Sequence, residues 1–203
     1  EEKLDEFAAH FARQRSPKLL ITTSFNPGHR VKQFILEMLS VFPVAIYYSR
    51  RDYGLKKIVK YAVAEGFTDL VVFNQDRKEV NGMLVSHLPE GPTAYFRLRN
   101  LKLRKEIPRC GAPTSHKPEM ILNNFDSRLG HRLARFFVSL FSQDPQFRGR
   151  QAATFHNQRD FIFFRHHRYV FEEKQREDST GRVTHKLKAR LQELGPRRSE
   201  ERR

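Results

Sequence analysis

The stretch "LLITTSFNPGHRVKQFILEMLSVFP" (residues 19–43) passes from a continuous apolar run through a turn into an amphipathic segment. After the turn "NPGH" (26–29), apolar residues follow the i, i+3, i+4, i+7, i+8 spacing of a helix with one buried face. These residues are Val31, Phe34, Ile35, Met38 and Leu39. The stretch therefore predicts a buried strand followed by a helix, the usual building unit of a mixed α/β sheet.

The same pattern returns 102 residues later in "ILNNFDSRLGHRLARFFVSLFSQDP" (121–145). Seven of the 25 aligned positions are identical, where ordinary composition gives about one or two. The apolar helix positions also recur at the same spacing, at Leu133, Phe136, Phe137, Leu140 and Phe141. We therefore predict two structurally similar halves.

Turn signals and apolar periodicity place further elements around the two copies. In the first half we expect strands over 44–49, 69–74, 83–88 and 93–100, a helix over about 54–65 and an Asn-Gly turn at 81–82. In the second half we expect a strand over 119–124, a helix over 128–142 and a hairpin of 150–155 with 161–171. This order of elements indicates an α/β fold with a mixed sheet.

Composition divides the chain into segments. We expect a short N-terminal helix in 1–16 and an α/β domain over 17–171, whose first half is 17–106 and whose second half is 119–171. The linker 107–118 contains three Pro and one Gly and has little periodicity. The charged C-terminal arm 172–203 is expected to be extended or partly disordered, or to complete the second half.

The charge of the chain points to a polyanionic partner. Lys and Arg total 38 against 23 Asp and Glu, so the formal charge is +15. The 18 Phe and 6 Tyr provide ample core material, so we expect a folded basic protein whose partner is a nucleic acid, with acidic lipid as the competing polyanion. The single Cys110 excludes an intramolecular disulfide and fits a reducing compartment. The longest apolar run, 41–48, is too short to span a bilayer,.

Catalytic and metal-binding patterns are sparse. The sequence contains no Gly-rich phosphate loop, HExxH, DxD or GxSxG motif,. His166 and His167 are adjacent, so on a strand they point to opposite faces and do not bind one ion together. We therefore expect no enzyme activity, no metal and no cofactor; the alternative is a nuclease or RNA-modifying enzyme that uses dispersed acids and histidines.

The repeated "GHR" runs suggest a phosphate site at the start of each helix, where backbone N–H groups are unpaired. The residues concerned are His29, Arg30, His131 and Arg132. The alternative is that they simply cover a helix start.

Two basic clusters are the strongest candidates for RNA contact, because their arginines alternate with residues that stack on bases or hydrogen-bond to them. The first is "RLRNLKLRK" (97–105) and the second is "FRGRQAATFHNQRDFIFFRHHRYVF" (147–171). The candidate RNA-binding residues are Arg97, Arg99, Lys102, Arg104, Lys105, Arg148, Arg150, Gln151, His156, Asn157, Gln158, Arg159, Arg165, His167 and Arg168. The alternative is a solvated charged surface.

The parity of the strand 161–171 divides its side chains between two faces. Phe161, Phe163, Arg165, His167, Tyr169 and Phe171 fall on one face, and Ile162, Phe164, His166, Arg168 and Val170 fall on the other,. Both faces are apolar at their ends and basic in the middle. We expect most of the rings to lie in a hairpin core and the Arg/His belt to emerge where the sheet loses its cover.

Several long motifs resemble the ribosome production factor 1 family of the Brix-domain superfamily. They are "FTDLVVFNQDRK", "LPEGPTAYFRL", "ILNNFDSRLGHRLARFFVSLF", "GRQAATFHNQRDFIFFRHHRYVF" and "LQELGPR", and the likeness extends from about Pro17 to Pro196. The resemblance implies a Brix domain built of two similar mixed-sheet halves, each resembling the anticodon-binding domain of class II aminoacyl-tRNA synthetases. It departs from the family pattern between "RYVF" and "LQELGPR", which leaves the last strand of the second half undefined.

The resemblance also implies a function. It implies a non-catalytic, rRNA-binding factor for assembly of the large (60S) ribosomal subunit and precursor rRNA maturation, located in the nucleolus of the nucleus. The implied partners are precursor rRNA and other pre-60S assembly factors, including one dedicated protein, and no membrane. The family's proposed RNA-contacting segment corresponds here to Gly149–Arg165. The alternative is a protein-docking adaptor with incidental RNA contact.

Overall fold

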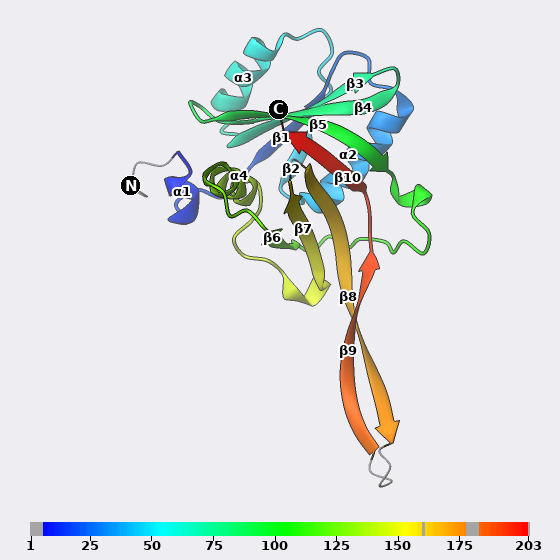
Figure 1. The fold of residues 1–203 in the computed structure, drawn as a ribbon. Coiled ribbons are helices and arrows are strands. Elements are labelled where there is room, and N and C mark those ends of the chain that lie inside the picture. The colour runs from blue at the N-terminus through cyan, green and yellow to red at the C-terminus, as the bar shows by residue number, and fades with distance from the viewer. Residues whose placement is uncertain (1–5, 160, 178–182, 203) are drawn as a thin grey trace.

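The structure is a computed structural model that describes residues 6–159, 161–177 and 183–202. Within this described part the strands form a ten-stranded sheet in the order β2-β1-β3-β4-β5-β10-β8-β7-β6, and β9 pairs with β8 alone (Figure 1). The mixed α/β architecture that the sequence predicted is confirmed.

The first half begins with a parallel strand-helix-strand unit. Strand β1 pairs in parallel with β2 and with β3, and β3, β4 and β5 follow as an antiparallel meander. The elements are β1 (Leu19–Thr23), α2 (His29–Val41), β2 (Ala45–Tyr47), α3 (Leu55–Ala64), β3 (Asp69–Asp76), β4 (Glu79–His87) and β5 (Thr93–Lys102).

The second half begins in the same way, because β6 and β7 pair in parallel on either side of a helix. Its elements are β6 (Glu119–Asn123), α4 (Arg128–Ser139), η3 (Phe147–Gly149), β7 (Gln151–Gln158), β8 (Phe161–Glu177), β9 (Val183–Glu193) and β10 (Arg197–Arg202), while η2 (Arg104–Glu106) ends the first half after β5. The repeated sequence thus corresponds to a repeated β-α-β unit. The two "GHR" runs are not equivalent, however, because α2 begins at His29 whereas α4 begins earlier, at Arg128.

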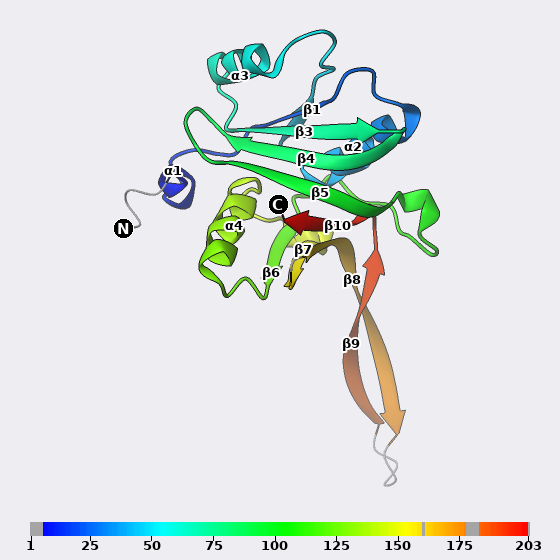
Figure 2. The same cartoon turned by 45° about the horizontal axis from the view of Figure 1, so that its top comes forward.

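One hydrophobic core joins the two halves. Helices α2 and α4 pack against the same side of the curved sheet (Figure 2), and their apolar faces belong to one buried cluster. Rings from the two halves meet there: Phe96 and Phe137 have centroids 5.3 Å apart, and Phe42 and Phe141 have centroids 4.8 Å apart. The halves therefore share a core rather than having one each.

Helix α3 lies on the opposite side of the sheet, where it covers β1, β3 and β4. Its Ile58 and Ala62 pack with Leu20, Leu70 and Val72 in a second, smaller cluster. Strand register shows how far this cover reaches. Val72 pairs with Leu84, which pairs with Tyr95, so these three side chains share one side. Tyr95 is already 43% exposed, and the cover of α3 ends at β5.

The N-terminal helix that was predicted within 1–16 is a single turn in the described residues. Helix α1 spans Ala8–Phe11, and residues 1–5 lie outside the described part. Arg13 has a φ of 56°, a left-handed conformation that does not continue an α-helix,. The segment is nevertheless anchored, since Phe7 and His10 are buried and Gln143 donates a hydrogen bond of 2.5 Å to the carbonyl of His10.

The predicted Asn-Gly turn at 81–82 is wrong. The β3-β4 hairpin turns at Arg77 and Lys78, whose φ values of 48° and 67° are both positive, as a tight hairpin turn requires,. Asn81 and Gly82 lie inside β4, and Asn81 accepts a hydrogen bond of 2.9 Å from Asn74 across the hairpin. A side chain at position 82 would overlap the Tyr95 ring, so packing explains this glycine.

The described residues of the C-terminal segment pair with the rest of the sheet. Strand β10 pairs antiparallel with β5 of the first half and with β8 of the second. Its Arg198 is 1% exposed, and the guanidinium lies 5.1 Å from the centroid of the Phe164 ring. β8 and β9 together form a two-stranded ribbon that projects from the body (Figure 1).

Candidate nucleic-acid interface

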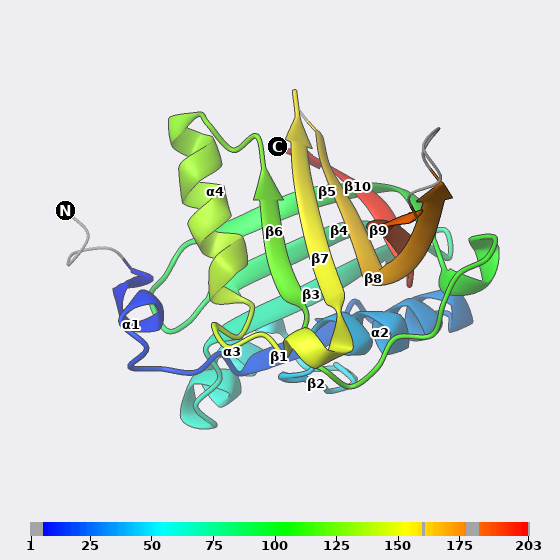
Figure 3. The same cartoon turned by 90° about the horizontal axis from the view of Figure 1, so that it is seen from below.

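The side chains of β8 alternate between a buried side and an uncovered side. Ile162, Phe164 and His166 are 0% exposed, whereas Phe161 and Phe163 are half-buried and belong to neither hydrophobic cluster. Figure 3 views β6, β7 and β8 from this uncovered side, with α4 beside them. We call this surface the open face. Among the residues whose side chains are described, it comprises by register Tyr95, Arg97, Arg99, Lys102, Thr154, His156, Gln158, Phe161, Phe163, Arg165, His167 and Arg197.

Register orders the open face into rows that cross the strands. Phe163 pairs with His156 on one side and with Ser199 on the other, and Ser199 pairs with Arg99. Phe161 lies next to Phe163, with ring centroids 6.4 Å apart. Because neighbouring strands are about 4.8 Å apart, Arg99 lies roughly 10 Å from Phe163 across the sheet. The rows therefore combine aromatic rings with flanking cations.

The sequence-based expectation for the rings was only partly correct. Of the six phenylalanines in 147–171, Phe155 and Phe164 are fully buried, while Phe147 and Phe171 are 70% and 51% exposed. Phe161 and Phe163 are half-buried on the open face. The reason is that helix cover exists on only one side of β7 and β8, and sequence parity does not show which side this is.

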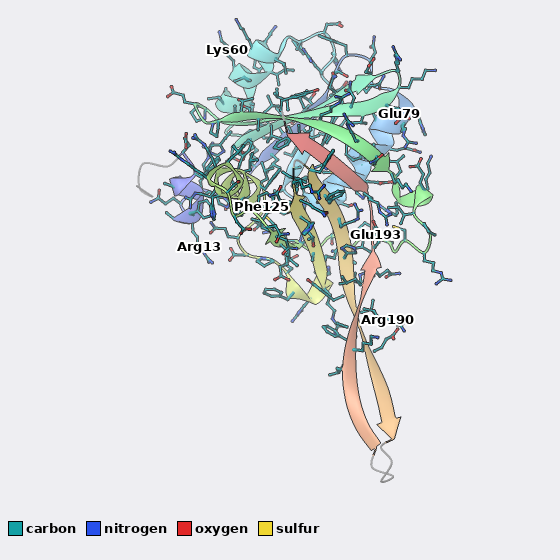
Figure 4. The ribbon with its side chains drawn as sticks, viewed as in Figure 1. Arg13, Lys60, Glu79, Phe125, Arg190 and Glu193 are labelled. Atoms are coloured by element: carbon teal, nitrogen blue, oxygen red, sulfur yellow. The ribbon has the colours of Figure 1, made fainter. Side chains whose placement is uncertain are left out.

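A basic corner of the open face forms where β8, β9 and β10 meet. Glu193 of β9 lies at this corner (Figure 4). It accepts a hydrogen bond of 2.8 Å from Arg197 Nε and pairs with His167 across the strands. Burial alone would raise the pKa of Glu193, but the hydrogen bond and charge of Arg197, with Arg165, outweigh it and lower that pKa. Glu193 thus binds Arg197 directly, and its charge also acts on Arg165 and His167.

Burial also lowers the pKa values of the neighbouring cationic side chains. It lowers the pKa of Arg165, assisted by the charge of Arg197, and it lowers the pKa of His167 against the attraction of Glu193. His166, on the opposite side, has Nδ1 3.2 Å from the Gly195 carbonyl oxygen, and burial lowers its pKa to about 4. His166 is therefore neutral at pH 7, and the two histidines face apart as parity predicted.

Two predicted RNA-binding residues have structural roles. Gln151 is 3% exposed, and its amide donates a hydrogen bond of 2.6 Å to Thr114 Oγ1 in the linker. Arg168 donates a hydrogen bond of 2.7 Å to the Ala112 carbonyl of the same linker. Both residues thus hold 107–118 against the sheet. Gln151 is too buried to contact a ligand, whereas Arg168 is only partly buried and its RNA contact stays a prediction. The side-chain amide of Asn157 donates a hydrogen bond of 2.6 Å to the Asn124 carbonyl.

The remaining candidates do not form one cluster. Arg148 and Arg150 are exposed at η3, and Arg159 is exposed at the far end of β7. Eight residues of strand separate these ends by roughly 25 Å,. Arg104 and Lys105 lie on η2 against α2, where Lys105 Nζ donates a hydrogen bond of 2.9 Å to Gln33 Oε1. Arg159, at the end of β7, is the one that adjoins the open face.

At the predicted phosphate site, Arg30 is already paired with two acidic residues, and a phosphate role for it stays a prediction. Its guanidinium makes hydrogen bonds to both carboxylate oxygens of Glu106, one of them 3.1 Å long, and its Nε lies 3.1 Å from Glu79. These interactions raise the pKa of Arg30, the hydrogen bond to Glu106 contributing most. Arg132 contacts Glu6 at 2.7 Å. His29 and His131 are exposed, and a phosphate role for them stays a prediction.

Sequence reasoning missed Tyr95 and Arg197 of the open face. Neither lies in a motif that suggests RNA contact, and Arg197 enters the site only because β10 inserts between β5 and β8. In the described residues there is no group of His, Cys, Asp or Glu side chains that fits a metal ion. Across the same part of the chain, no helix has the length and apolarity needed to cross a membrane.

The fold and the family model agree on the class of protein. Residues 24–199 match the Brix domain model, and the chain belongs to the Brix domain family. The chain resembles in fold the crystal structure of a probable ribosomal biogenesis protein from Aeropyrum pernix K1, with a TM-score of 0.58 and 17% identity over 92% of this chain and 97% of that one.

Among curated proteins, the chain is similar to ribosome production factor 1. It is 52% identical over 198 residues to that protein of Rattus norvegicus and 50% identical over 198 residues to that of Xenopus laevis. In both cases the match covers 97% of this chain and 54% of the relative. The chain thus spans about half the length of the curated relatives it matches.

Proposed function

We propose that this chain is the Brix domain of a ribosome biogenesis factor that binds precursor rRNA during assembly of the large (60S) subunit in the nucleolus. The proposal is supported by membership of the Brix domain family and by the similarity to proteins named for ribosome production. We further propose that it acts with other pre-60S factors and without bond chemistry of its own.

The observation that carries the proposal is the open face. It is a sheet surface without helix cover on which half-buried rings lie among cations, in a protein with a formal charge of +15. Exposed rings on a sheet are suited to stacking on unpaired bases, and cations that flank them are suited to phosphates.

The proposed mechanism is holding and positioning of RNA. Phe161, Phe163 and His156 stack on bases, while Arg99, Lys102 and Arg159 contact the backbone and supply most of the affinity. Glu193 fixes Arg197 at one corner of the surface, where Arg197 and Arg165 add positive potential. A rigid sheet loses little conformational entropy when RNA binds, which suits a surface that positions a flexible strand.

The test of this proposal is the salt dependence of RNA binding. Replacement of the exposed cations Arg99, Lys102 and Arg159 by Gln should weaken binding to single-stranded precursor rRNA fragments. It should also flatten the log–log salt dependence by about 2 units if all three meet phosphates. The measurement is fluorescence anisotropy across a salt series.

A matched control removes the same charge elsewhere. Lys32, Lys78 and Arg128 are also exposed, and their Gln variant should keep most of the slope,. A second variant, Phe161→Leu with Phe163→Leu, should lose affinity without a change of slope, because stacking releases no counterions. Equal slopes in the open-face variant, the control and the wild type would overturn the assignment.

A specific observation favours a second function, that of a protein-docking adaptor. Phe171, Leu187 and Leu191 are 51%, 66% and 60% exposed on the projecting ribbon. Register places Leu191 beside Tyr169 and Ala189 beside Phe171 on one face, while Arg190 and Glu172 pair at 3.0 Å on the other. Such an amphipathic ribbon is suited to an apolar surface of a partner protein.

A further inference from the structure

A second aromatic cleft lies between α3 and the edge of the sheet formed by β1 and β2. The cleft has a volume of about 400 Å³, which is within the range of small-molecule sites. Its floor is apolar and includes Leu20, Ile58 and Phe67, and its walls are Tyr48, Tyr53 and Tyr61. Half of the six tyrosines in the chain therefore line one cleft.

The three tyrosine rings are unusually exposed for their size. Tyr48, Tyr53 and Tyr61 are 58%, 44% and 55% exposed. The rings of Tyr53 and Tyr61 stand nearly perpendicular, at 84° with centroids 6.3 Å apart. The two rings therefore do not stack on the same flat ligand face: one offers a stacking face and the other forms a side wall.

Cations surround the cleft. Lys57 Nζ lies 4.8 Å from the Tyr53 ring centroid and 5.8 Å from that of Tyr61, and Lys18 Nζ lies 4.4 Å from that of Phe67. Arg50 also lines the cleft. Lys60 extends from helix α3, the helix that carries Lys57 (Figure 4). Glu65 is the one acidic residue that lines the cleft, and its carbonyl accepts a hydrogen bond from Lys18.

We propose that this cleft holds a single unpaired nucleobase of RNA, stacked on a tyrosine, with its phosphates against Lys57 and the neighbouring cations. The proposal rests on RNA being the ligand of this chain, but it does not require the open face. Helix α3 covers the same side of the sheet on which the open face lies, so the cleft is a second contact on that side.

The chemistry of the cleft favours a base over a peptide. The basic rim attracts a polyanion and repels the cationic side chains that aromatic cages otherwise bind. Tyrosine adds a flat, polarizable face with a hydroxyl at its end, which suits a base that needs both stacking and hydrogen bonds at its edge. An aliphatic or proline-rich peptide carries no negative charge that would interact with Lys18 and Lys57.

The experiment compares Tyr53→Leu with Tyr61→Leu, made together, against the Tyr53→Phe, Tyr61→Phe pair. The Leu pair keeps the apolar volume but removes the rings, and it should lower affinity for a single-stranded RNA oligonucleotide roughly 5- to 100-fold. The Phe pair should bind within about threefold of the wild type, because stacking needs only the ring. Both pairs should keep the wild-type salt slope.

A second readout locates the base directly. An oligonucleotide that carries 4-thiouridine should crosslink to peptides containing Tyr48, Tyr53 or Tyr61. Unchanged affinity in a folded Leu pair, or crosslinks that avoid this cleft, would overturn the proposal; if the pair does not fold, the single Tyr61→Leu variant gives the same comparison. Loss of a bound protein rather than RNA would assign the cleft to a peptide instead.

The outcomes separate this proposal from the one for the open face. If the open-face variant loses salt slope while the Leu pair binds normally, only the cleft proposal fails. If the Leu pair weakens binding and the open-face variant matches its control, only the open face fails. Absence of RNA binding by the wild-type chain would remove both.

Discussion

At the scale of the residue, burial decides what each polar side chain can do. Gln151 and Arg30 belong to motifs that suggest a nucleic-acid contact. Gln151 is buried and bonded to Thr114, whereas Arg30 is partly exposed and paired with Glu106. A buried polar group is costly unless it is paired, so such residues are held by their internal partners. Sequence identifies the residue type, whereas burial assigns its use.

His166 gives a prediction at this scale. Its pKa of about 4 lies below the usual 6.5 because the charged form is buried, so the unfolded chain binds more protons between these pH values. Stability due to neutral His166 is therefore complete above about pH 6.5 and decreases by about 3 kcal/mol as the pH falls to about 4. His166→Gln should show a smaller decrease.

The measurement is urea unfolding of both proteins at about pH 7 and about pH 4.5. Burial lowers the pKa of His10 and of His167 as well, but the wild type and His166→Gln both retain those residues. The difference in pH dependence between the two proteins therefore reports the contribution of His166 alone. Identical pH dependence in the two proteins would contradict a buried neutral histidine at this position.

At the scale of the element, strong periodicity predicted the long helices well. The apolar spacing of 31–39 and 133–141 correctly indicated α2 and α4, because one face of each helix packs in the shared core. Short elements were less predictable. The turn at Arg77 and Lys78 uses positive φ values at residues that do not favour them, and tertiary pairing of β3 with β4 compensates for this cost.

The ribbon of β8 and β9 gives the prediction at this scale. Leu187→Ser with Leu191→Ser should remove protein partners that co-purify with the chain, because the apolar face of the ribbon is lost. RNA affinity and the unfolding midpoint should remain near the wild-type values, since both leucines are exposed. The measurement is affinity purification after nuclease treatment.

A control for the ribbon changes its other face. Lys188→Ser with Arg190→Ser alters the charged side and should retain the partner. Loss of the partner in both variants, or in neither, would count against docking through the apolar face.

At the scale of the whole molecule, the two halves share one main core and one sheet. Phe137 of α4 lies 5.3 Å from Phe96 of the first half and 4.6 Å from Phe155 of the second, so one ring connects both. Strand β10 adds backbone pairing to each half. The division into halves describes the repeated pattern, while the core and the sheet are continuous.

We therefore expect a single unfolding transition. Phe137→Ala should destabilise the entire domain by about 3 to 5 kcal/mol, because it leaves a cavity at the junction of the halves. Hydrogen exchange should report equal loss of protection in β4 and in β7. Two separate transitions, or loss of protection confined to β7, would show that the halves are independent.

The sequence by itself determined the α/β class, the repeated strand-helix unit and the basic character, because these depend on local periodicity and composition. The tertiary structure alone decided that β10 lies between the halves, that one core serves both, and that Phe161 and Phe163 stay outside it. These features depend on which segments pair across long separations and on where α3 ends its cover of the sheet. Alternation along a strand defines two faces, but only the packing of helices from elsewhere in the chain decides which face is left open to a partner.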